Sequence, residues 1–275
     1  MNLKDQIIWI TGASSGIGAA MAVEYSKLGA RLILSSRNTD ELNHVRSSCE
    51  VPEKIKVLKL DLANPSDFNR IVKEAANFYG HIDILINNAG ISQRSLAADT
   101  SLEVDRKIFD INYFGTIALT KELIPYFKEK GQGHFVVITS VVGKIGTPLR
   151  SSYSASKHAL HGFFDSLRAE LHEDHIKVSL ICPGFVNTNV SINALTGQGK
   201  QQGTKDKATA NGLDPDFFAK KAIKSIYKEK QEVVIGGFLE VYLFTLTFLS
   251  NTFWNSIINN SIEGIKMFCE TNLFS

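Results

Sequence analysis

The stretch IIWITGASSGIG, residues 7–18, places a short apolar run directly before a glycine-rich turn. A run of this length that is apolar or β-branched throughout is typical of a buried strand. Gly12, Gly16 and Gly18 follow it and lead into a helical pattern that starts near Ala19. Glycines in this position let the chain turn tightly and let backbone N–H groups approach a pyrophosphate at the start of a helix. The stretch therefore predicts a strand, a nucleotide-binding turn and a helix in that order.

Apolar runs of strand length recur along the chain and alternate with stretches of helical period. The strand-like runs are IIWIT near residue 7, RLILSS near 31, IKVLKL near 55, IDILINN near 82, HFVVITS near 134, KVSLICPG near 177 and EVVIGG at 232–237. The helical stretches are Ala19 to Leu28, Asp67 to Tyr79, Val104 to Lys130 and Ser152 to Glu173. Strands that are apolar throughout and alternate with helices indicate a parallel sheet covered on both faces. The predicted fold class is α/β with a doubly wound parallel sheet, a Rossmann fold.

The bulk properties predict one globular domain over residues 1–275. The chain has 44% hydrophobic and 21% charged residues and a formal net charge of +2, which is too balanced for a nucleic-acid-binding surface. Cys49, Cys182 and Cys269 show no CxxC spacing, so we expect neither a disulfide framework nor a zinc site, and a reducing compartment fits best. The N-terminus enters the first strand within a few residues, which leaves no room for a signal peptide.

Two segments lie outside the strand and helix pattern. Residues 191–215 are polar and rich in Gly, Lys and Gln, and we expect a flexible flap or substrate loop there. Residues 238–275 form a C-terminal extension whose part from Phe238 to Ile258 has 13 apolar or aromatic residues in 21. Glu240 and other polar residues argue against a membrane span. A helix over the substrate pocket, a subunit interface and an amphipathic segment on a membrane remain open.

The second strand-like run is followed by residues that bear on cofactor choice. Its end is expected beside the adenine ribose, where an acidic side chain would pair with the 2′-hydroxyl of NAD and repel a 2′-phosphate. The chain has Ser36 and Arg37 there, and a guanidinium beside a hydroxyl suits a phosphate. The sequence favours NADP(H), while NAD(H) and an arginine that only faces solvent remain alternatives.

Tyr153 and Lys157 lie four residues apart in SSYSASKHAL, residues 151–160. In a helix this spacing places both side chains on one face, where the ammonium would lower the pKa of the phenol. A phenol with its ordinary pKa of about 10 is a poor proton donor or acceptor at neutral pH. Taken alone, the pair is typical of a solvated surface. Asn112 and Ser140, in FDINYFGT and VVITSVVG, add further polar groups of the kind that such chemistry needs.

Together these pieces resemble the short-chain dehydrogenase/reductase family, in its branch with a TGxxxGxG turn. The resemblance covers roughly Ile7 to Thr188 and rests on TGASSGIG (11–18), DL (61–62), NNAG (87–90), N at 112, S at 140, YSASK (153–157) and PGFVNT (183–188). It implies that Tyr153 is the general acid/base and that Lys157 lowers its pKa and holds the nicotinamide ribose. It also implies that Ser140 binds the substrate oxygen and that Asn112 supports a proton relay to Lys157.

The resemblance further implies cofactor contacts along the strand ends. It places Asp61 and Leu62 against the adenine and Asn87 to Gly90 along the adenosine ribose. It places Val186 and Thr188 near the nicotinamide carboxamide and the pyrophosphate, and it implies that Pro183-Gly184 is the turn that shapes the pocket. From the residues alone, Asp61 is also consistent with a turn or helix cap, and the asparagines with loop backbone bonding. The implied cofactor-binding residues are Gly12, Ser14, Ser15, Gly16, Ile17, Gly18, Arg37, Asp61, Leu62, Asn88, Ala89, Gly90, Tyr153, Lys157, Pro183, Gly184, Val186 and Thr188.

The expected activity is NADPH-dependent reduction of a carbonyl, or the reverse oxidation of a secondary alcohol. A bulky apolar substrate such as a steroid, a retinoid or another lipid is favoured, because some family members with such substrates carry a similar apolar C-terminal extension. Reduction of 3-oxoacyl groups on a carrier protein is an alternative, and a non-catalytic NADPH-binding sensor or scaffold is another. The resemblance implies a homodimer or homotetramer. The cysteine pattern and the N-terminus favour a cytoplasmic protein, and the C-terminal segment leaves peripheral membrane contact open.

The histidines give no sign of a metal site. The seven are His44, His81, His134, His158, His161, His172 and His175. None has carboxylate or cysteine neighbours at ligand spacing, so we expect solvated side chains and a mechanism without metal. Cys182 precedes the Pro183-Gly184 turn, and we expect a packed rather than a reactive thiol.

Overall fold

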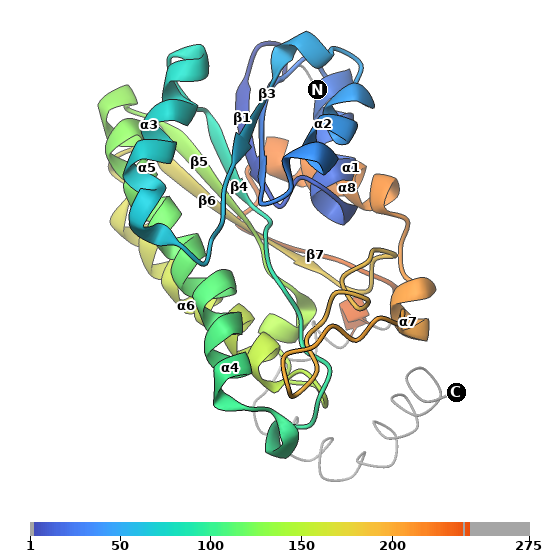
Figure 1. Ribbon diagram of the computed structural model, residues 1–275. Coiled ribbons are helices and arrows are strands. Elements are labelled where there is room, and N and C mark those ends of the chain that lie inside the picture. Colours follow the sequence, from blue (N-terminus) through green and yellow to red (C-terminus); the bar gives the residue numbers. More distant parts are fainter. Residues whose placement is uncertain (1–2, 239, 243–275) are drawn as a thin grey trace.

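The computed structural model describes residues 3–238 and 240–242 (Figure 1). In this part of the chain seven parallel strands form one sheet in the order β3-β2-β1-β4-β5-β6-β7. The strands are β1 (Ile7–Thr11), β2 (Arg31–Ser36), β3 (Ile55–Lys59), β4 (Ile84–Asn87), β5 (Gly133–Ile138), β6 (Ile176–Pro183) and β7 (Glu232–Ile235). The strand order reverses direction between β1 and β4, so the predicted doubly wound parallel sheet is confirmed.

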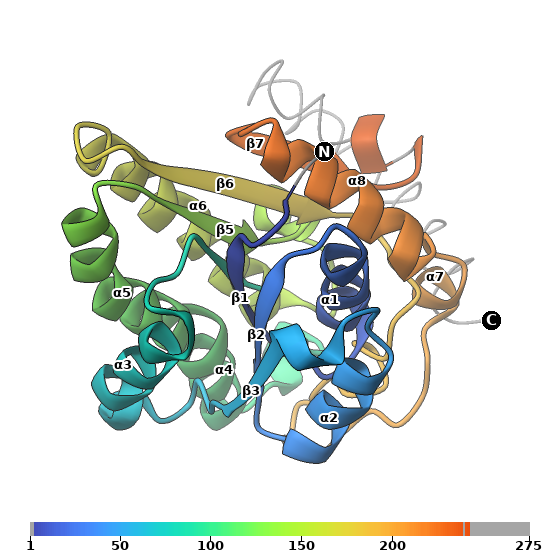
Figure 2. The same ribbon diagram turned by 90° about the horizontal axis from the view of Figure 1, so that it is seen from above.

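Helices cover both faces of the sheet. Figure 2 shows α1, α2 and α8 on one side and α3, α4, α5 and α6 on the other. The α-helices are α1 (Gly16–Lys27), α2 (Thr39–Ser47), α3 (Phe68–Tyr79), α4 (Leu102–Phe109), α5 (Thr116–Lys130), α6 (Ser151–Glu170), α7 (Lys207–Ala210) and α8 (Pro215–Tyr227). Short 3₁₀ turns span Pro52–Lys54, Pro65–Asp67, Ala97–Asp99 and Val141–Gly143.

Side chains of β1 supply both halves of the core. Ile8 and Ile10 pack among residues of α1 and α8, whereas Ile7 and Trp9 pack among residues of α3, α5 and α6. This alternation is the period of two that a strand imposes on its side chains. Both faces of the strand are apolar because both are covered, which is why the run in the sequence is continuously hydrophobic.

The helical stretch expected from Val104 to Lys130 is helical throughout, but it is not one regular α-helix. Between α4 and α5 the chain forms a π-helical turn, η4 (Asp110–Gly115). Gly115 lies so close to the β3–α3 connection that a Cβ on it would sit 2.2 Å from the Leu62 carbonyl oxygen. A π-helical turn shifts the following side chains relative to a regular helix, and such turns are frequent at functional sites.

The substrate loop predicted at residues 191–215 is tied to the rest of the protein by a buried ion-pair cluster. Asp206 lies 2.6 Å from Arg94 and 3.5 Å from Arg150, and each of the three side chains is only 7% exposed. Arg94 follows β4 and Arg150 precedes α6, so the cluster joins three segments that are distant in sequence. Gln202 donates a further hydrogen bond to Asp206 (2.9 Å). The flexibility of this loop remains a prediction.

The beginning of the C-terminal extension is described at Phe238 and at residues 240–242, and it is helical. A carboxylate oxygen of Glu240 accepts a hydrogen bond from the backbone N–H of Phe185 (3.4 Å), so the extension starts against the segment that follows β6. The rest of the apolar stretch, residues 243–258, lies outside the described residues. Within the described residues, we find no helix that combines the length and the apolarity needed to cross a bilayer.

Two of the seven histidines, His134 and His161, are buried, which corrects the expectation that all are solvated. His134 lies on β5, and its Nε2 is 2.8 Å from the Ser179 hydroxyl on β6. The pKa of His134 falls from 6.5 to about 4, mainly because of burial; the charge of Lys177 contributes to the fall, and that of Glu229 opposes it. No sequence pattern signals this burial, because it depends on the pairing of β5 with β6, which brings Ser179 to the imidazole.

The Asp206 cluster leads to a stability prediction. We expect Asp206→Ala to lower the free energy of unfolding by about 3 kcal/mol, because two buried guanidinium groups lose their carboxylate. Denaturant unfolding followed by circular dichroism measures the change. The control is Asp165→Ala, which removes an exposed partner of Arg168 and should cost at most about 1 kcal/mol. Equal losses in the two variants would contradict the importance of the cluster.

The buried His134 predicts a dependence of stability on pH. Between about pH 6.5 and pH 4 the unfolded chain takes up a proton at this residue and the folded protein does not, so the free energy of unfolding falls as the pH falls. Over that range this residue accounts for a loss of about 3 kcal/mol. Urea titrations at pH 7 and pH 4.5 should show a smaller pH effect in His134→Gln than in the wild type. The exposed His44, changed to Gln, should leave the pH effect as it is.

Candidate active site

A cleft of about 1060 Å³ lies along the carboxyl ends of the strands. Its wall includes residues at or just after the ends of β1 to β6, where ligands bind in open parallel sheets. Most of the residues predicted for cofactor and substrate line it together: Gly12, Ser14, Ser15, Gly16, Ile17, Arg37, Asp61, Leu62, Asn88, Ala89, Gly90, Ser140, Tyr153, Lys157, Pro183, Gly184, Val186 and Thr188. Gly18 and Asn112 do not belong to this wall.

The glycine-rich turn has the shape that a pyrophosphate needs. Gly12 has a φ of 64°, and a Cβ on it would lie 2.7 Å from the Cα of Ala89. Gly16, with a φ of 54°, begins α1, and the Ser15 side chain that precedes it makes no capping hydrogen bond. The first N–H groups of α1 therefore keep their bonding capacity for an anion. Gly18 serves packing, because a Cβ there would lie 2.4 Å from the Gly12 carbonyl oxygen.

The asparagines after β4 bond to backbone and also shape the cleft. The Asn88 amide donates to the carbonyl oxygens of Thr11 (3.0 Å) and Gly12 (3.1 Å), which ties β4 to the glycine-rich turn. Asn87 points away from the cleft, is buried, and donates to the Thr120 hydroxyl (3.1 Å). Asp61 accepts a hydrogen bond from the Ala63 N–H (3.1 Å) and also lines the cleft. It can therefore stabilise the turn and contact a ligand at the same time.

Arg37 lies directly after β2, is exposed, and lines the cleft beside Ser36 and Asn38. Asn38 is the N-cap of α2, and its side chain accepts hydrogen bonds from the N–H groups of Asp40 and Glu41. Arg37 thus lies at the edge of the cleft directly before a capped helix, at the position where the sequence predicted a contact to the adenosine end of a dinucleotide.

Tyr153 and Lys157 lie one turn apart near the start of α6 and face the cleft. The Lys157 ammonium is buried and donates to the Ile138 carbonyl oxygen (2.9 Å) at the end of β5. It lies 5.8 Å from the centre of the Tyr153 ring. The Ser140 hydroxyl donates to the Pro183 carbonyl oxygen (3.4 Å) and accepts from the Val142 N–H (3.3 Å). Strand ends and one helix therefore converge on this part of the cleft.

The expected fall in the pKa of Tyr153 is wrong for this structure. Burial raises the pKa of the phenol above its ordinary value of 10. The charge of Arg94, a hydrogen bond with Ser140 and the charge of Arg150 all favour the phenolate, but they do not offset the burial. Lys157 is not among these causes; burial lowers the pKa of its own amine to about 8. The cations that act on the phenol are thus the two arginines bound to Asp206.

Asn112 lies behind the cleft in the π-helical turn η4. Its side chain is fully buried; Oδ1 accepts from the Ile91 N–H (2.8 Å), and Nδ2 donates to the Ile91 carbonyl (2.9 Å) and to the Ser156 hydroxyl (3.1 Å). A Cβ on Gly90 would lie 3.1 Å from Asn112 Oδ1 and 3.6 Å from the Lys157 ammonium. Asn112 therefore fixes the segment after β4 next to the lysine.

Several cleft residues were not predicted. The 191–215 loop contributes Asn193, Leu195, Gly199 and Gln201, and Leu195 is held by backbone bonds to Ser92 (2.8 Å) and Arg94 (2.8 Å). Arg94 was also not predicted as a charge that acts on the pKa of Tyr153. Its position shortly after β4, four residues beyond NNAG, was the available signal, because residues after strands face the ligand in this fold. The loop residues carry no comparable signal in the sequence.

Comparisons with known proteins identify the family of this chain. A family model described as short chain dehydrogenase matches residues 6–199. The mouse (Mus musculus) protein Dehydrogenase/reductase SDR family member 7B is 42% identical over 252 residues, which cover 89% of this chain and 78% of the mouse protein. The Drosophila melanogaster protein Dehydrogenase/reductase SDR family protein 7-like is 41% identical over 239 residues, which cover 85% of this chain and 73% of that protein.

Solved structures show the same fold. A short-chain dehydrogenase from Streptomyces avermitilis is 26% identical, superimposes with a TM-score of 0.78, and the match covers 95% of this chain and 98% of that one. A short-chain dehydrogenase/reductase from Burkholderia phymatum in complex with NAD is 21% identical with a TM-score of 0.76, over 85% and 90% of the two chains. The family model and the relatives together place this chain in the short-chain dehydrogenase/reductase family.

Proposed function

We propose that the protein is an NADPH-dependent oxidoreductase that reduces a carbonyl on a bulky apolar substrate, or oxidises the corresponding secondary alcohol. The observation that carries the proposal is that Tyr153, Lys157 and Ser140 line the same cleft as the glycine-rich turn. A dinucleotide and a proton donor are then available to one substrate. The volume of the cleft, about 1060 Å³, exceeds what a small ligand alone occupies.

The residues of the cleft fit a dinucleotide phosphate. The turn from Gly12 to Ile17 and the uncapped start of α1 would hold the pyrophosphate. Arg37 would bind the 2′-phosphate, and Asp61 and Leu62 would lie against the adenine. The segment from Asn88 to Gly90 would follow the ribose. The segment from Pro183 to Thr188 and the Lys157 ammonium would bind the nicotinamide end.

Bound NADPH would supply the hydride, and the chain's own residues would supply the proton and hold the oxygen. Tyr153 would donate its proton to the substrate oxygen, which the Ser140 hydroxyl also binds. The raised pKa of Tyr153 keeps the phenol protonated at neutral pH, as a donor requires. Arg94 and Arg150 would stabilise the phenolate that remains. Lys157, with Asn112 fixing the adjacent backbone, would return a proton to it.

Apolar side chains in the cleft wall favour an apolar substrate. The 191–215 loop brings Leu195 to the cleft, and Ile91 and Val190 line it as well. Arg94 and Arg150 are not part of the cleft wall, and both lie within ion-pair distance of Asp206, so neither is placed to bind a charged substrate. A lipid carbonyl fits these walls better than a polar metabolite. Homo-oligomerisation and a cytoplasmic location remain predictions.

The central test is Tyr153→Phe. We expect turnover to fall at least about 1000-fold, because the variant keeps the ring and loses the proton donor. A panel of steroid, retinoid, fatty-acyl and 3-oxoacyl carbonyls, with the matching alcohols, is assayed with NADPH, NADH, NADP and NAD. Binding of NADPH, measured by fluorescence titration, should stay within a few-fold of the wild type. Turnover that persists in this variant would rule out the assignment; binding without any wild-type turnover would favour a sensor.

A second test addresses the cofactor. We expect Arg37→Asp to weaken NADPH binding by at least about 10-fold, because a charge-assisted hydrogen bond is replaced by repulsion of the 2′-phosphate. NADH binding should be unchanged or tighter, because the carboxylate can accept from the ribose 2′-hydroxyl. The matched control, Arg70→Asp, alters an exposed arginine on α3 and should change neither affinity. An equal loss for both cofactors would contradict a phosphate-specific role of Arg37.

A further inference from the structure

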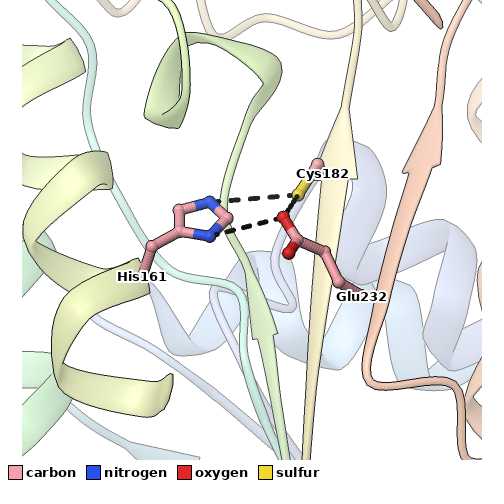
Figure 3. A group of neighbouring side chains, drawn as sticks. All are labelled: His161, Cys182 and Glu232. Carbon is pink, nitrogen blue, oxygen red and sulfur yellow. Dashed lines mark hydrogen bonds and ion pairs between the residues drawn. The ribbon is translucent and has the colours of Figure 1, made fainter. Parts of the chain in front are cut away.

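The structure gathers an imidazole, a thiol and a carboxylate at one place behind the cleft (Figure 3). His161 comes from α6, Cys182 from β6 and Glu232 from the first residue of β7. In the register of β6 and β7, Leu180 pairs with Glu232 and Cys182 pairs with Val234. Cys182 and Glu232 are therefore diagonal neighbours on the sheet face that α6 covers. The expectation that no histidine lies beside a cysteine and a carboxylate is therefore wrong for His161.

The donor atoms have the spacing of a zinc site. Cys182 Sγ lies 3.6 Å from Glu232 Oε1, and the ring nitrogens of His161 lie 3.9 Å from Sγ and 3.5 Å from Oε1. Donors bound tetrahedrally to Zn²⁺ at about 2.0–2.3 Å are about 3.4–3.6 Å apart. Nε2 is the nitrogen that faces Sγ and Nδ1 is the one that faces Oε1, while one ligand atom from each residue lies within 4.8 Å of the other two. To bind one metal ion with the other two donors, the imidazole must rotate so that a single nitrogen approaches both of them.

The bonding of the three side chains leaves capacity for a ligand. His161 Nδ1 is buried and has no hydrogen-bond partner within the described residues. An unsatisfied nitrogen of this kind is costly unless something binds it. Cys182 Sγ accepts one hydrogen bond, from the Thr139 hydroxyl (3.2 Å). The Lys144 ammonium lies 3.0 Å from Glu232 Oε1 and 3.3 Å from Oε2, so it can keep one oxygen if a metal takes the other.

The cluster can be reached from solvent on one side. His161 is 6% exposed, whereas the carboxylate of Glu232 and the ammonium of Lys144 are 24% and 22% exposed. A cation can therefore approach past Lys144 and Glu232 and meet the thiol and imidazole behind them. The first donor is a carboxylate and the deeper donors are sulfur and nitrogen, a set typical of Zn²⁺ rather than of Mg²⁺ or Ca²⁺.

We propose that His161, Cys182 and Glu232 form a binding site for Zn²⁺ or a similar thiophilic divalent cation, separate from the cofactor cleft. On binding, the Cys182 thiol loses its proton to solvent as the metal–sulfur bond forms. One imidazole nitrogen and one Glu232 oxygen complete three protein ligands, and water fills the fourth position. Lys144 moves from Oε1 and retains Oε2. The proposal does not depend on the proposed enzymatic function.

The test is metal binding by the purified, metal-free full-length protein in a reducing buffer. Zn²⁺ affinity is measured by competition with a chromophoric chelator, and Co²⁺ serves as a spectroscopic probe. We expect one metal per chain, with a thiolate-to-cobalt charge-transfer band in the near ultraviolet and tetrahedral bands in the visible. Zn²⁺ should also raise the melting temperature.

Variants locate the site. We expect Cys182→Ser and His161→Gln each to weaken Zn²⁺ binding by more than about 100-fold, and Cys182→Ser to remove the charge-transfer band. Glu232→Gln, which keeps the side-chain shape, serves as a further test of the site if either of these two variants fails to fold. Lys144→Met should tighten binding roughly 3- to 10-fold, because it removes the ammonium that competes for Glu232.

Matched controls decide between this site and others. Cys49→Ser alters another buried free cysteine, and His158→Gln alters an exposed histidine one helical turn before His161. Both variants should leave the Zn²⁺ affinity unchanged. Cys269→Ser addresses the third cysteine of the chain. Absence of binding in the wild type, or binding that survives Cys182→Ser and is lost in Cys269→Ser, would overturn the proposal.

Discussion

The parallel pairing of β1 with β4 is the constraint on which the site depends. It brings the turn after β1 against the segment after β4, so that a Cβ on Gly12 would lie 2.7 Å from Ala89. Asn88 closes the contact through its bonds to Thr11 and Gly12. Only glycine permits this approach, and the approach creates the cleft. The other strands extend the sheet on both sides and add their carboxyl ends to the same edge.

Within that cleft, burial rather than a single neighbouring cation sets the protonation of the tyrosine. Removal of Tyr153 and Lys157 from water disfavours both charged forms, so the pKa of the phenol rises and that of the amine falls. Arg94 and Arg150 counter part of this effect, and Asp206 holds them in place. The loop that carries Asp206 is thereby linked to the chemistry of the phenol as well as to the shape of the substrate pocket.

α6 and β6 serve two regions of the molecule. One turn of α6 presents Tyr153 and Lys157 to the cleft, and the next presents His161 to Cys182 and Glu232. Gly143 packs against both His161 and Lys157: a Cβ on it would lie 3.0 Å from the His161 ring and 3.2 Å from the Lys157 Cβ. Lys157 and the proposed metal site are therefore neighbours with Gly143 packed between them, and both lie against the same strand ends.

The sequence by itself determined the parallel sheet and the glycine-rich turn, because these follow from local periodicity and from the backbone freedom of glycine, whereas most of the predicted cleft residues came from the resemblance to the family. Strand period two and helix period 3.6 are properties of neighbouring residues. The tertiary structure decided the π-helical turn at η4, the burial of His134 and His161, and the direction of the Tyr153 pKa shift. It also joined Arg94 to Asp206, 112 residues apart, and aligned Cys182 with Glu232. Desolvation and charge contacts of this kind depend on which distant segments pack together, and that information is absent from any short stretch of the chain.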